Sequence, residues 1–173
     1  MKWLPLLTLL VFTQDAAPTV PAARPREKTT YREGKCEVLF PVDPRFEQQW
    51  VTTTQGRLLL NRAFAETNGG RVVYLVCWHD LPKATRSNPP SIMLDRLRDG
   101  LLSSLEGTLI SEGPCRLEPH TGLECTVRNA QGLLVRARFF AVKERMYQVM
   151  VIGGAADMDL ETQKFFNSFK VLP

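Results

Sequence analysis

Four consecutive residues near the middle of the chain bring together a thiol, an imidazole and a carboxylate: Cys77-Trp78-His79-Asp80. Alternate residues of a β-strand share a face, so Cys77 and His79 are expected to point to the same side. A cysteine and a histidine in contact form a nucleophile and its base, and His79 with Asp80 offers a second catalytic pair. A strand whose polar end meets solvent explains the same residues without chemistry, and we favour that interpretation.

The remaining motifs of enzymes and metal sites are missing from the sequence. A zinc site needs ligand spacings such as Cys-x-x-Cys, and Cys77 with His79 would need further ligands from distant strands. The other histidine, His120, is predicted to lie in a turn, where its side chain is solvated. The sequence has no Gly-x-Ser-x-Gly elbow and no phosphate-binding glycine loop. We therefore expect a protein that is not an enzyme and that binds no metal or cofactor.

The chain has four cysteines, Cys36, Cys77, Cys115 and Cys125, and an even number suggests disulfide bonds in an exported protein. Cys115 and Cys125 flank a predicted hairpin. A three-residue loop at 119–121 would set them directly opposite each other, within disulfide range. Cys36 and Cys77 would form the second pair. The alternative is four buried free thiols, since cysteine is often a small core residue.

The N-terminus has the pattern of a secretory signal. Lys2 is followed by a mostly apolar run over residues 3–12, much shorter than the about 20 residues that a spanning helix needs. Small residues precede a cleavage position after Ala22, so residues 1–22 are predicted to be a signal peptide, with a buried strand or helix as the alternative. Residues 23–33 are predicted to form a Pro/Ala-rich linker. We expect export to the periplasm or the extracellular space, with no transmembrane segment in the mature chain.

Charge and composition limit the classes of partner. The formal net charge is +4, and basic residues are interleaved with acidic ones, as in Lys143-Glu144-Arg145. Proteins that bind nucleic acid gather Lys and Arg on one face, with aromatic residues between them. We therefore expect no nucleic-acid partner. The apolar content of 44% is ordinary for a globular protein, and residues 34–173 are long enough for one domain with a real core.

Most of that domain is predicted to be antiparallel sheet, because strand-like runs follow one another with short turns between them. Asn68-Gly69-Gly70 is a strong turn, and residues 71–80 are apolar on both faces, which is typical of a central strand. The strand-like runs cover residues 35–41, 49–54, 57–66, 71–80, 108–118, 123–129, 133–142 and 146–152.

Two segments have helical spacing instead. Leucines predict a helix from Ile92 to Leu105, with Asn88 or Ser91 as its cap and Gly107 at its end. A second helix is predicted over residues 159–169, with a buried stripe of Thr162, Phe165, Phe166 and Phe169. The predicted fold class is α+β: an antiparallel sheet of about six to seven strands covered by two helices.

The hairpin at residues 133–152 contains a candidate binding feature. Arg136 and Arg138 alternate with apolar residues, which indicates a half-exposed strand. The two arginines are a candidate contact stripe, and a solvated face is the alternative.

Three segments are similar to parts of a known domain family. They are the strand–turn–strand of residues 117–124, the hairpin of residues 136–152, and the helix end Phe165-Phe166-Asn167-Ser168-Phe169-Lys170-Val171. With Phe40-Pro41, they resemble the PsbP-like domain family and small exported bacterial proteins of that fold, over about residues 34–173. The resemblance implies a PsbP-like αβα sandwich that acts as a protein-binding or assembly module, and it supplies no catalytic residue.

Together these features predict an exported, non-enzymatic binding or assembly module whose partner is a protein or a component of the cell envelope. The alternative is a carrier that holds an apolar small molecule between the sheet and the helix at residues 92–105, since leucines and aromatic residues are plentiful there. The sequence leaves the identity of the partner and the oligomeric state open.

Overall fold

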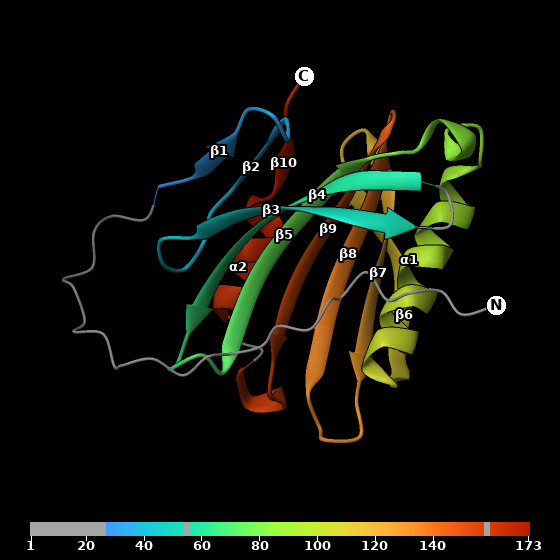
Figure 1. The fold of residues 1–173 in the computed structure, drawn as a ribbon. Coiled ribbons are helices and arrows are strands. Elements are labelled where there is room, and N and C mark those ends of the chain that lie inside the picture. The colour runs from blue at the N-terminus through green and yellow to red at the C-terminus, as the bar shows by residue number, and fades with distance from the viewer. Residues whose placement is uncertain (1–26, 54–55, 158–159) are drawn as a thin grey trace.

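The computed structural model describes residues 27–53, 56–157 and 160–173. Its centre is a seven-stranded antiparallel sheet with one helix on each face, α1 on one side and α2 on the other (Figure 1). A three-stranded sheet lies on the α2 side, and each face of the large sheet has its own hydrophobic core. The predicted α+β class, the sheet of about seven strands and its two helical covers are confirmed.

The large sheet consists of two meanders that meet at its centre. Its strand order is β3-β4-β5-β9-β8-β7-β6, so the first three strands pair in chain order and the last four do the same. The β5–β9 pair joins the two halves. The strands are β3 (Arg45–Thr53), β4 (Gly56–Thr67), β5 (Val72–Asp80), β6 (Thr108–Leu117), β7 (His120–Arg128), β8 (Leu134–Val142) and β9 (Arg145–Gly153).

The two central strands are buried on both faces. Every residue of β5 except Asp80 is buried, and so is every residue of β9 except Arg145. Helices on both sides of the sheet require apolar residues on both faces of these strands, as predicted for residues 71–80. The turn before β5 is Asn68-Gly69-Gly70, with φ values of 53°, 66° and 84°. Asn and Gly tolerate these positive angles, so the predicted turn is confirmed.

Helix α1 (Pro90–Leu105) covers one face of the sheet and buries Met93, Leu94 and Leu101. A short 3-10 helix, Lys83–Thr85, precedes it. The predicted caps are wrong: Pro89 occupies the N-cap position, and no side chain caps the helix. Pro90 at the first helical position has no N–H group that would need a partner, which lessens the need for a cap.

The C-terminal end of α1 also differs from expectation. Glu106, with φ of 47°, adopts the left-handed conformation that ends the helix, and Gly107 follows it. The Gly107 N–H donates to the Leu102 carbonyl at 3.0 Å. Gly107 is needed for space, because a Cβ atom there would lie 2.6 Å from a methyl group of Val127.

Helix α2 (Leu160–Ser168) packs on the opposite face, after a 3-10 turn at Ala155–Asp157. The predicted stripe is confirmed, since Thr162, Phe165, Phe166 and Phe169 are all buried. The Phe165 ring lies 5.2 Å from that of Tyr74 in the sheet.

The small sheet was not predicted as a sheet, although its middle strand falls within the predicted run at residues 35–41. It consists of β1 (Thr29–Tyr31), β2 (Cys36–Val38) and β10 (Lys170–Val171), with β2 in the middle. β1 falls within the segment predicted as a linker, so regular structure begins before Gly34. Strands of two or three residues are too short to show a periodic pattern, and only their long-range pairing makes them strands.

The β6–β7 hairpin has another register than predicted. Leu117 faces His120 across a two-residue turn, Glu118-Pro119, so His120 belongs to a strand rather than to a loop. The Glu118–Pro119 peptide bond is cis. None of the helices within the described residues has the length and apolar character needed to cross a membrane.

Candidate functional site

The residues that suggested nucleophilic chemistry do not form a catalytic arrangement. Cys77 and His79 share the α1 face of β5, as predicted, and both are buried. Burial raises the pKa of the Cys77 thiol to about 12, so the thiol keeps its proton at neutral pH. Burial likewise lowers the pKa of His79. The His79 Nδ1 atom lies 3.2 Å from the backbone oxygen of Asp80, while the Asp80 carboxylate accepts a 2.7 Å hydrogen bond from Arg145.

All four cysteines are free, which contradicts the predicted disulfide bonds. Cys115 faces Gly122 and Cys125 faces Glu112, because the real turn is shorter than the predicted loop. The register is displaced by an odd number of residues, and such a displacement moves a side chain to the other face of the sheet. Cys115 therefore packs on the α2 side and Cys125 on the α1 side.

Cys36 and Cys77 are separated in the same way, since Cys36 belongs to the core on the α2 side and Cys77 to the core on the α1 side. Burial raises the pKa of the Cys36 thiol to about 12. Within the described ranges, no group of three or more His, Cys, Asp or Glu residues is placed to hold a metal ion.

Arg136 and Arg138 do not form an exposed stripe. Both are partly buried and both bond to Glu124 on β7, with closest distances of 2.6 Å each. Their guanidinium groups also lie over the Phe166 ring of α2, at 5.4 and 4.9 Å from its centre. The two arginines instead connect the sheet to α2, and Arg138 also lines a groove.

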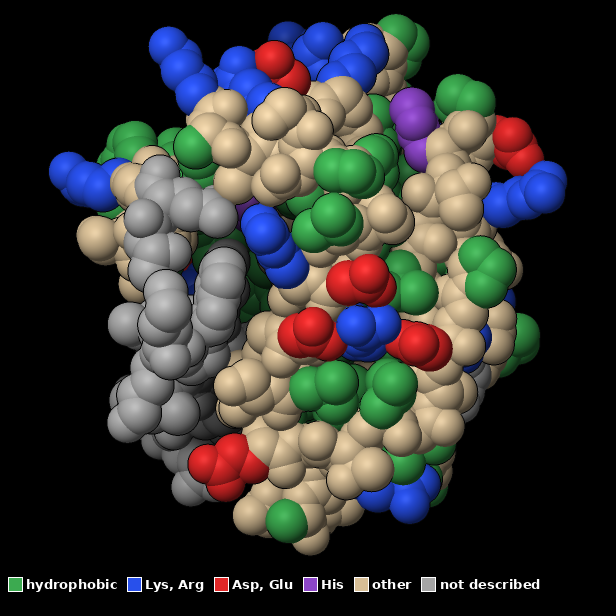
Figure 2. Space-filling model, turned by 90° about the vertical axis from the view of Figure 1, so that its right-hand side faces the viewer, with side chains coloured by type: hydrophobic (Ala, Val, Ile, Leu, Met, Phe, Trp, Pro, Cys, Tyr) green, Lys and Arg blue, Asp and Glu red, His purple; other side chains and the backbone are tan. Residues whose placement is uncertain are grey.

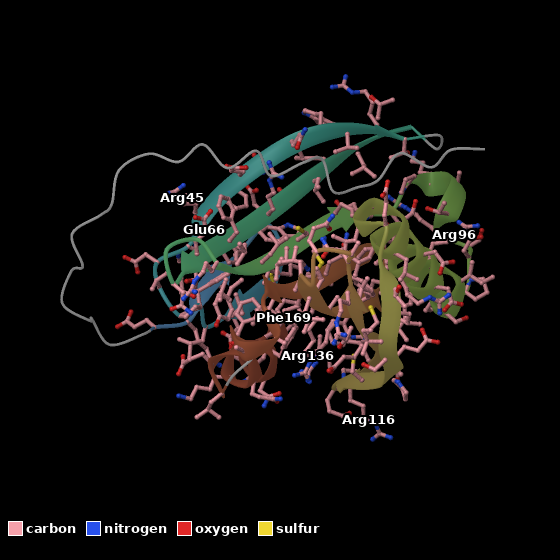
Figure 3. The ribbon with its side chains drawn as sticks, turned by 90° about the horizontal axis from the view of Figure 1, so that it is seen from below. Arg45, Glu66, Arg96, Arg116, Arg136 and Phe169 are labelled. Atoms are coloured by element: carbon pink, nitrogen blue, oxygen red, sulfur yellow. The ribbon has the colours of Figure 1, made fainter. Side chains whose placement is uncertain are left out.

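This groove, which we call the α2 groove, has a volume of about 460 Å³ and is open to solvent. It runs between the β6–β7 hairpin and the segment from α2 to β10. Figure 3 shows Arg116, Arg136 and Phe169 on this same side of the sheet, with Arg136 between the other two. The lining residues are Arg116, Leu117, Glu118, Arg138, Phe140, Phe166, Asn167, Phe169, Lys170 and Val171.

The α2 groove combines aromatic and cationic side chains. The rings of Phe140 and Phe169 stack at 6.0 Å, and Phe166 lines the groove beside them. Three cations and one carboxylate line the groove. The side chains of Arg116 and Lys170 are 84% and 61% exposed, so their charges remain accessible to a ligand.

The ion pairs of these two exposed cations are weak. Arg116 lies 3.9 Å from Glu118, and Lys170 lies 4.0 Å from Glu37. Exposed pairs at such distances contribute little free energy. An anionic group that enters the groove could therefore contact both cations without breaking a strong interaction.

The charges on the α1 side are balanced differently. Arg98 bonds to Asp95, Asp99 and Glu112 at 2.9 to 3.1 Å. Figure 2 looks onto this side and shows a basic group among three acidic ones near its centre. This cluster neutralises its own arginine, so the cationic, aromatic groove on the α2 side is the stronger candidate for binding.

A second hollow, of about 430 Å³, lies at the other end of the sheet order, near β3 and β4. Trp50 and Arg57 line it, with the Arg57 guanidinium 5.0 Å above the Trp50 ring. Arg86 and Asp80 also line it, but each already has an ion-pair partner: Glu144 for Arg86 and Arg145 for Asp80.

Sequence reasoning singled out Arg138 but missed Arg116 and Lys170. No local pattern could reveal the groove, because its two walls come from residues 116–118 and 166–171. The one available signal was the alternation of basic and apolar residues around Arg136, which marks the wall but not the hollow.

Comparisons with known proteins agree with this fold. No family model matches the chain, and no curated protein matches it. The solution structure of the cyanobacterial PsbP protein (CyanoP) of Synechocystis sp. PCC 6803 is similar, with a TM-score of 0.60 and 10% sequence identity, covering 91% of this chain and 98% of that one. A Pseudomonas aeruginosa protein of unknown function matches with a TM-score of 0.41 and 10% identity, over 77% of this chain and 85% of its own. The fold is therefore of the PsbP-like kind.

Proposed function

We propose that the protein is an exported, non-enzymatic binding module that holds a segment of a partner protein in the α2 groove. One observation carries this proposal: two exposed cations with only weak ion pairs lie in the same groove as a wall of phenylalanine side chains. The segment that fits is one with a carboxylate next to an apolar or aromatic side chain. The carboxylate would lie between Arg116 and Lys170, and the apolar side chain would pack on Phe166 and Phe169.

The wall of the groove is held in place by contacts with the rest of the molecule. Arg138 is held by Glu124 at 2.6 Å, and Phe169 packs against both Phe140 and Tyr147. A preformed wall loses little conformational entropy when a ligand binds. The two exposed cations, Arg116 and Lys170, can form charge-assisted hydrogen bonds to a carboxylate, which are of the stronger kind.

We infer in addition that the chain is a distant PsbP-like protein. The fold supports this inference over 91% of the chain, and the segments 117–124 and 136–152 carry the sequence resemblance. Proteins of this family mostly act as binding or assembly modules, which agrees with a groove suited to a protein segment.

Export is supported by the residues at positions 1–22. Cell fractionation and mass spectrometry of the mature N-terminus test it. We expect a protein outside the cytoplasm that begins at Ala23. An uncleaved protein in the cytoplasm would contradict export while leaving the binding proposal intact.

Photo-crosslinking in the native compartment tests the groove itself. A photoreactive amino acid replaces Asn167 in the groove or, as the control, Arg96 on α1, which lies on the far side of the molecule (Figure 3). We expect a discrete crosslinked partner from position 167 and none from position 96. The same product from both positions, or none from position 167, would contradict the proposal.

Charge reversal then tests the chemistry with the purified partner. Arg116→Glu and Lys170→Glu should each weaken binding by about tenfold or more. Added salt should reduce the difference in affinity between each variant and the wild-type protein. Arg96→Glu makes the same change of charge outside the groove and should change the affinity by less than about twofold. Equal losses in all three variants would show a general effect of net charge and refute a specific groove.

The carrier alternative receives less support. Met93, Leu94 and Leu101 of α1 are buried in one continuous core with the sheet, and no residue of α1 lines either hollow described above. An apolar ligand would have to separate these packed side chains. Solvent extraction of the native protein followed by mass spectrometry would reveal a bound lipid if the carrier hypothesis were correct.

A further inference from the structure

The two edges of the large sheet differ in how they are protected. β6 forms one edge and contains Pro114, which has no N–H group, and an irregularity between Leu109 and Ser111. Prolines and bulges are common devices that prevent an edge strand from pairing with another chain. β3 forms the other edge and has neither. It pairs with β4 in an uninterrupted register from Arg45 to Thr53, and among the described residues no strand pairs with its outer side.

This unprotected edge displays two large aromatic side chains. Phe46 is 46% exposed and Trp50 is 59% exposed. They are four residues apart on one strand, so they project from the same face. Each ring has a contact within its own chain: the Phe46 ring stacks on Trp78 at 5.7 Å, and the guanidinium of Arg57 lies 5.0 Å from the Trp50 ring.

We propose that β3 pairs antiparallel with β3 of a second copy of this chain, around a twofold axis at Gln48. In this register each Phe46 faces Trp50 of the other copy, because both residues lie two positions from the axis. The arrangement is self-complementary, and it forms two cross-strand aromatic pairs on the same face of one continuous sheet. Because Phe46 and Trp50 lie at equal distances from Gln48, a second copy of β3 offers an aromatic partner to each of them.

The charges of β3 are compatible with this register. Arg45 would face Val51 of the second copy, and Glu47 would face Gln49, so no like charges are directly opposed. Glu47 is already paired with Arg62 at 2.8 Å within its own chain. The side chain of Gln48, at the axis, donates a 2.8 Å hydrogen bond to Asn61 of its own chain.

The exposed aromatic side chains would supply part of the area that a dimer buries. Side chains of this type bury 150–250 Å² each, so the exposed parts of four of them would contribute about 450 Å². A standard interface buries about 1,600 Å² in total, so the remaining area would have to come from the strand backbones and their flanking side chains.

Sedimentation velocity over a range of concentrations tests the dimer. The wild-type protein should associate to a dimer, and Trp50→Lys should raise the dissociation constant by about thirtyfold or more, the effect of losing an aromatic hot spot. Ile110→Lys is the matched control, because Ile110 is 48% exposed on the opposite edge strand. It should leave the dissociation constant within about threefold of the wild-type value.

Disulfide trapping tests the register in a Cys115→Ser background. Gln48→Cys lies on the axis and should form a disulfide-linked dimer on oxidation, because directly opposed strand residues fall within disulfide range. Thr52→Cys lies four residues from the axis in each copy and should not. A wild-type protein that stays monomeric, a dimer unaffected by Trp50→Lys, or a dimer that Gln48→Cys fails to trap would overturn the proposal. Each result is independent of ligand binding in the α2 groove.

Discussion

Glu124 on β7 and Arg138 on β8 face each other directly across the sheet, with the Arg138 Nε atom 2.6 Å from one carboxylate oxygen. The other oxygen accepts two hydrogen bonds from Arg136, at 2.8 and 2.6 Å. Burial alone would raise the pKa of Glu124, but the hydrogen bonds from the two arginines together hold this pKa below its usual value. One carboxylate thus fixes two cations against α2 and shapes the wall of the α2 groove.

Replacing the Glu124 carboxylate should lower the stability of the fold, although the site is partly exposed. Glu124→Gln leaves two partly buried guanidinium groups without their counter-charge, and we expect the free energy of unfolding to fall by about 1–3 kcal/mol. Because the pKa of Glu124 is lowered in the folded state, its stabilising effect is complete above the unfolded pKa of about 4.5 and is lost as pH falls through the folded value. Urea denaturation at several pH values should therefore show that the difference in unfolding free energy between the wild-type protein and Glu124→Gln becomes smaller in acid.

The control for that experiment is Glu161→Gln. Glu161 pairs with Lys164 at 2.9 Å, but the lysine side chain is 52% exposed. An exposed pair of this kind contributes less than about 1 kcal/mol. Equal destabilisation by both substitutions would contradict a special role for Glu124.

Gly122 should not tolerate a side chain. A Cβ atom there would collide with the Phe139 carbonyl oxygen and the Phe140 ring, which belong to the neighbouring strand. We expect Gly122→Ala to lower the free energy of unfolding by about 2 kcal/mol or more, since backbone must move to make room. Gly113→Ala is the matched control on β6, because no atom lies within 4 Å of a Cβ placed there. Thermal unfolding that ranks the two variants equally would refute the packing argument.

His79 should make the fold sensitive to mild acid. Burial lowers its pKa from 6.5, and the Nε2 atom is buried without a hydrogen-bond partner. The unfolded chain therefore binds a proton at a higher pH than the folded protein does. Stability should fall as pH drops below about 6.5, by at most about 1.4 kcal/mol per pH unit from this group.

Two substitutions separate titration from packing. His79→Leu and His79→Gln both remove the ionisable ring, so both should lose the same part of the pH dependence between about pH 7 and pH 5. Their stabilities at neutral pH are free to differ, because leucine and glutamine pack differently. Chemical denaturation that shows an unchanged pH profile in both variants would exclude His79 as the titrating group.

The cysteines should behave as buried, protonated thiols. Burial raises the pKa values of Cys115 and Cys125 to about 11, as it raises those of Cys36 and Cys77 to about 12. A thiol reagent should react slowly with the native protein, and first with Cys115, which is only half-buried. Four thiols should react in denaturant without a reductant. A count of two or none would establish disulfide bonds instead.

The differences between prediction and structure concern register and pairing. The alternation of residues predicted the strands β6 and β7. The turn between them, Glu118-Pro119, is one residue shorter than the predicted loop at residues 119–121. Alternation has a period of two, so it is equally consistent with registers that place Cys115 and Cys125 on the same face or on opposite faces. Gly122 packs against the Phe140 ring on the α2 side, so Cys125, three residues further along β7, faces the α1 side.

Local residue patterns by themselves determined the strands of the large sheet, the two helices, the turn at Asn68-Gly69-Gly70 and the α+β class, because periodicity and turn chemistry act over a few neighbouring residues. The tertiary structure decided what those patterns could not contain. It joined β5 to β9, assembled β2 with β10, and brought Arg116 to the same groove as Lys170. Such contacts depend on which apolar faces pack together across long stretches of chain. All the elements of the core contribute to that packing, so no single segment of the sequence specifies it.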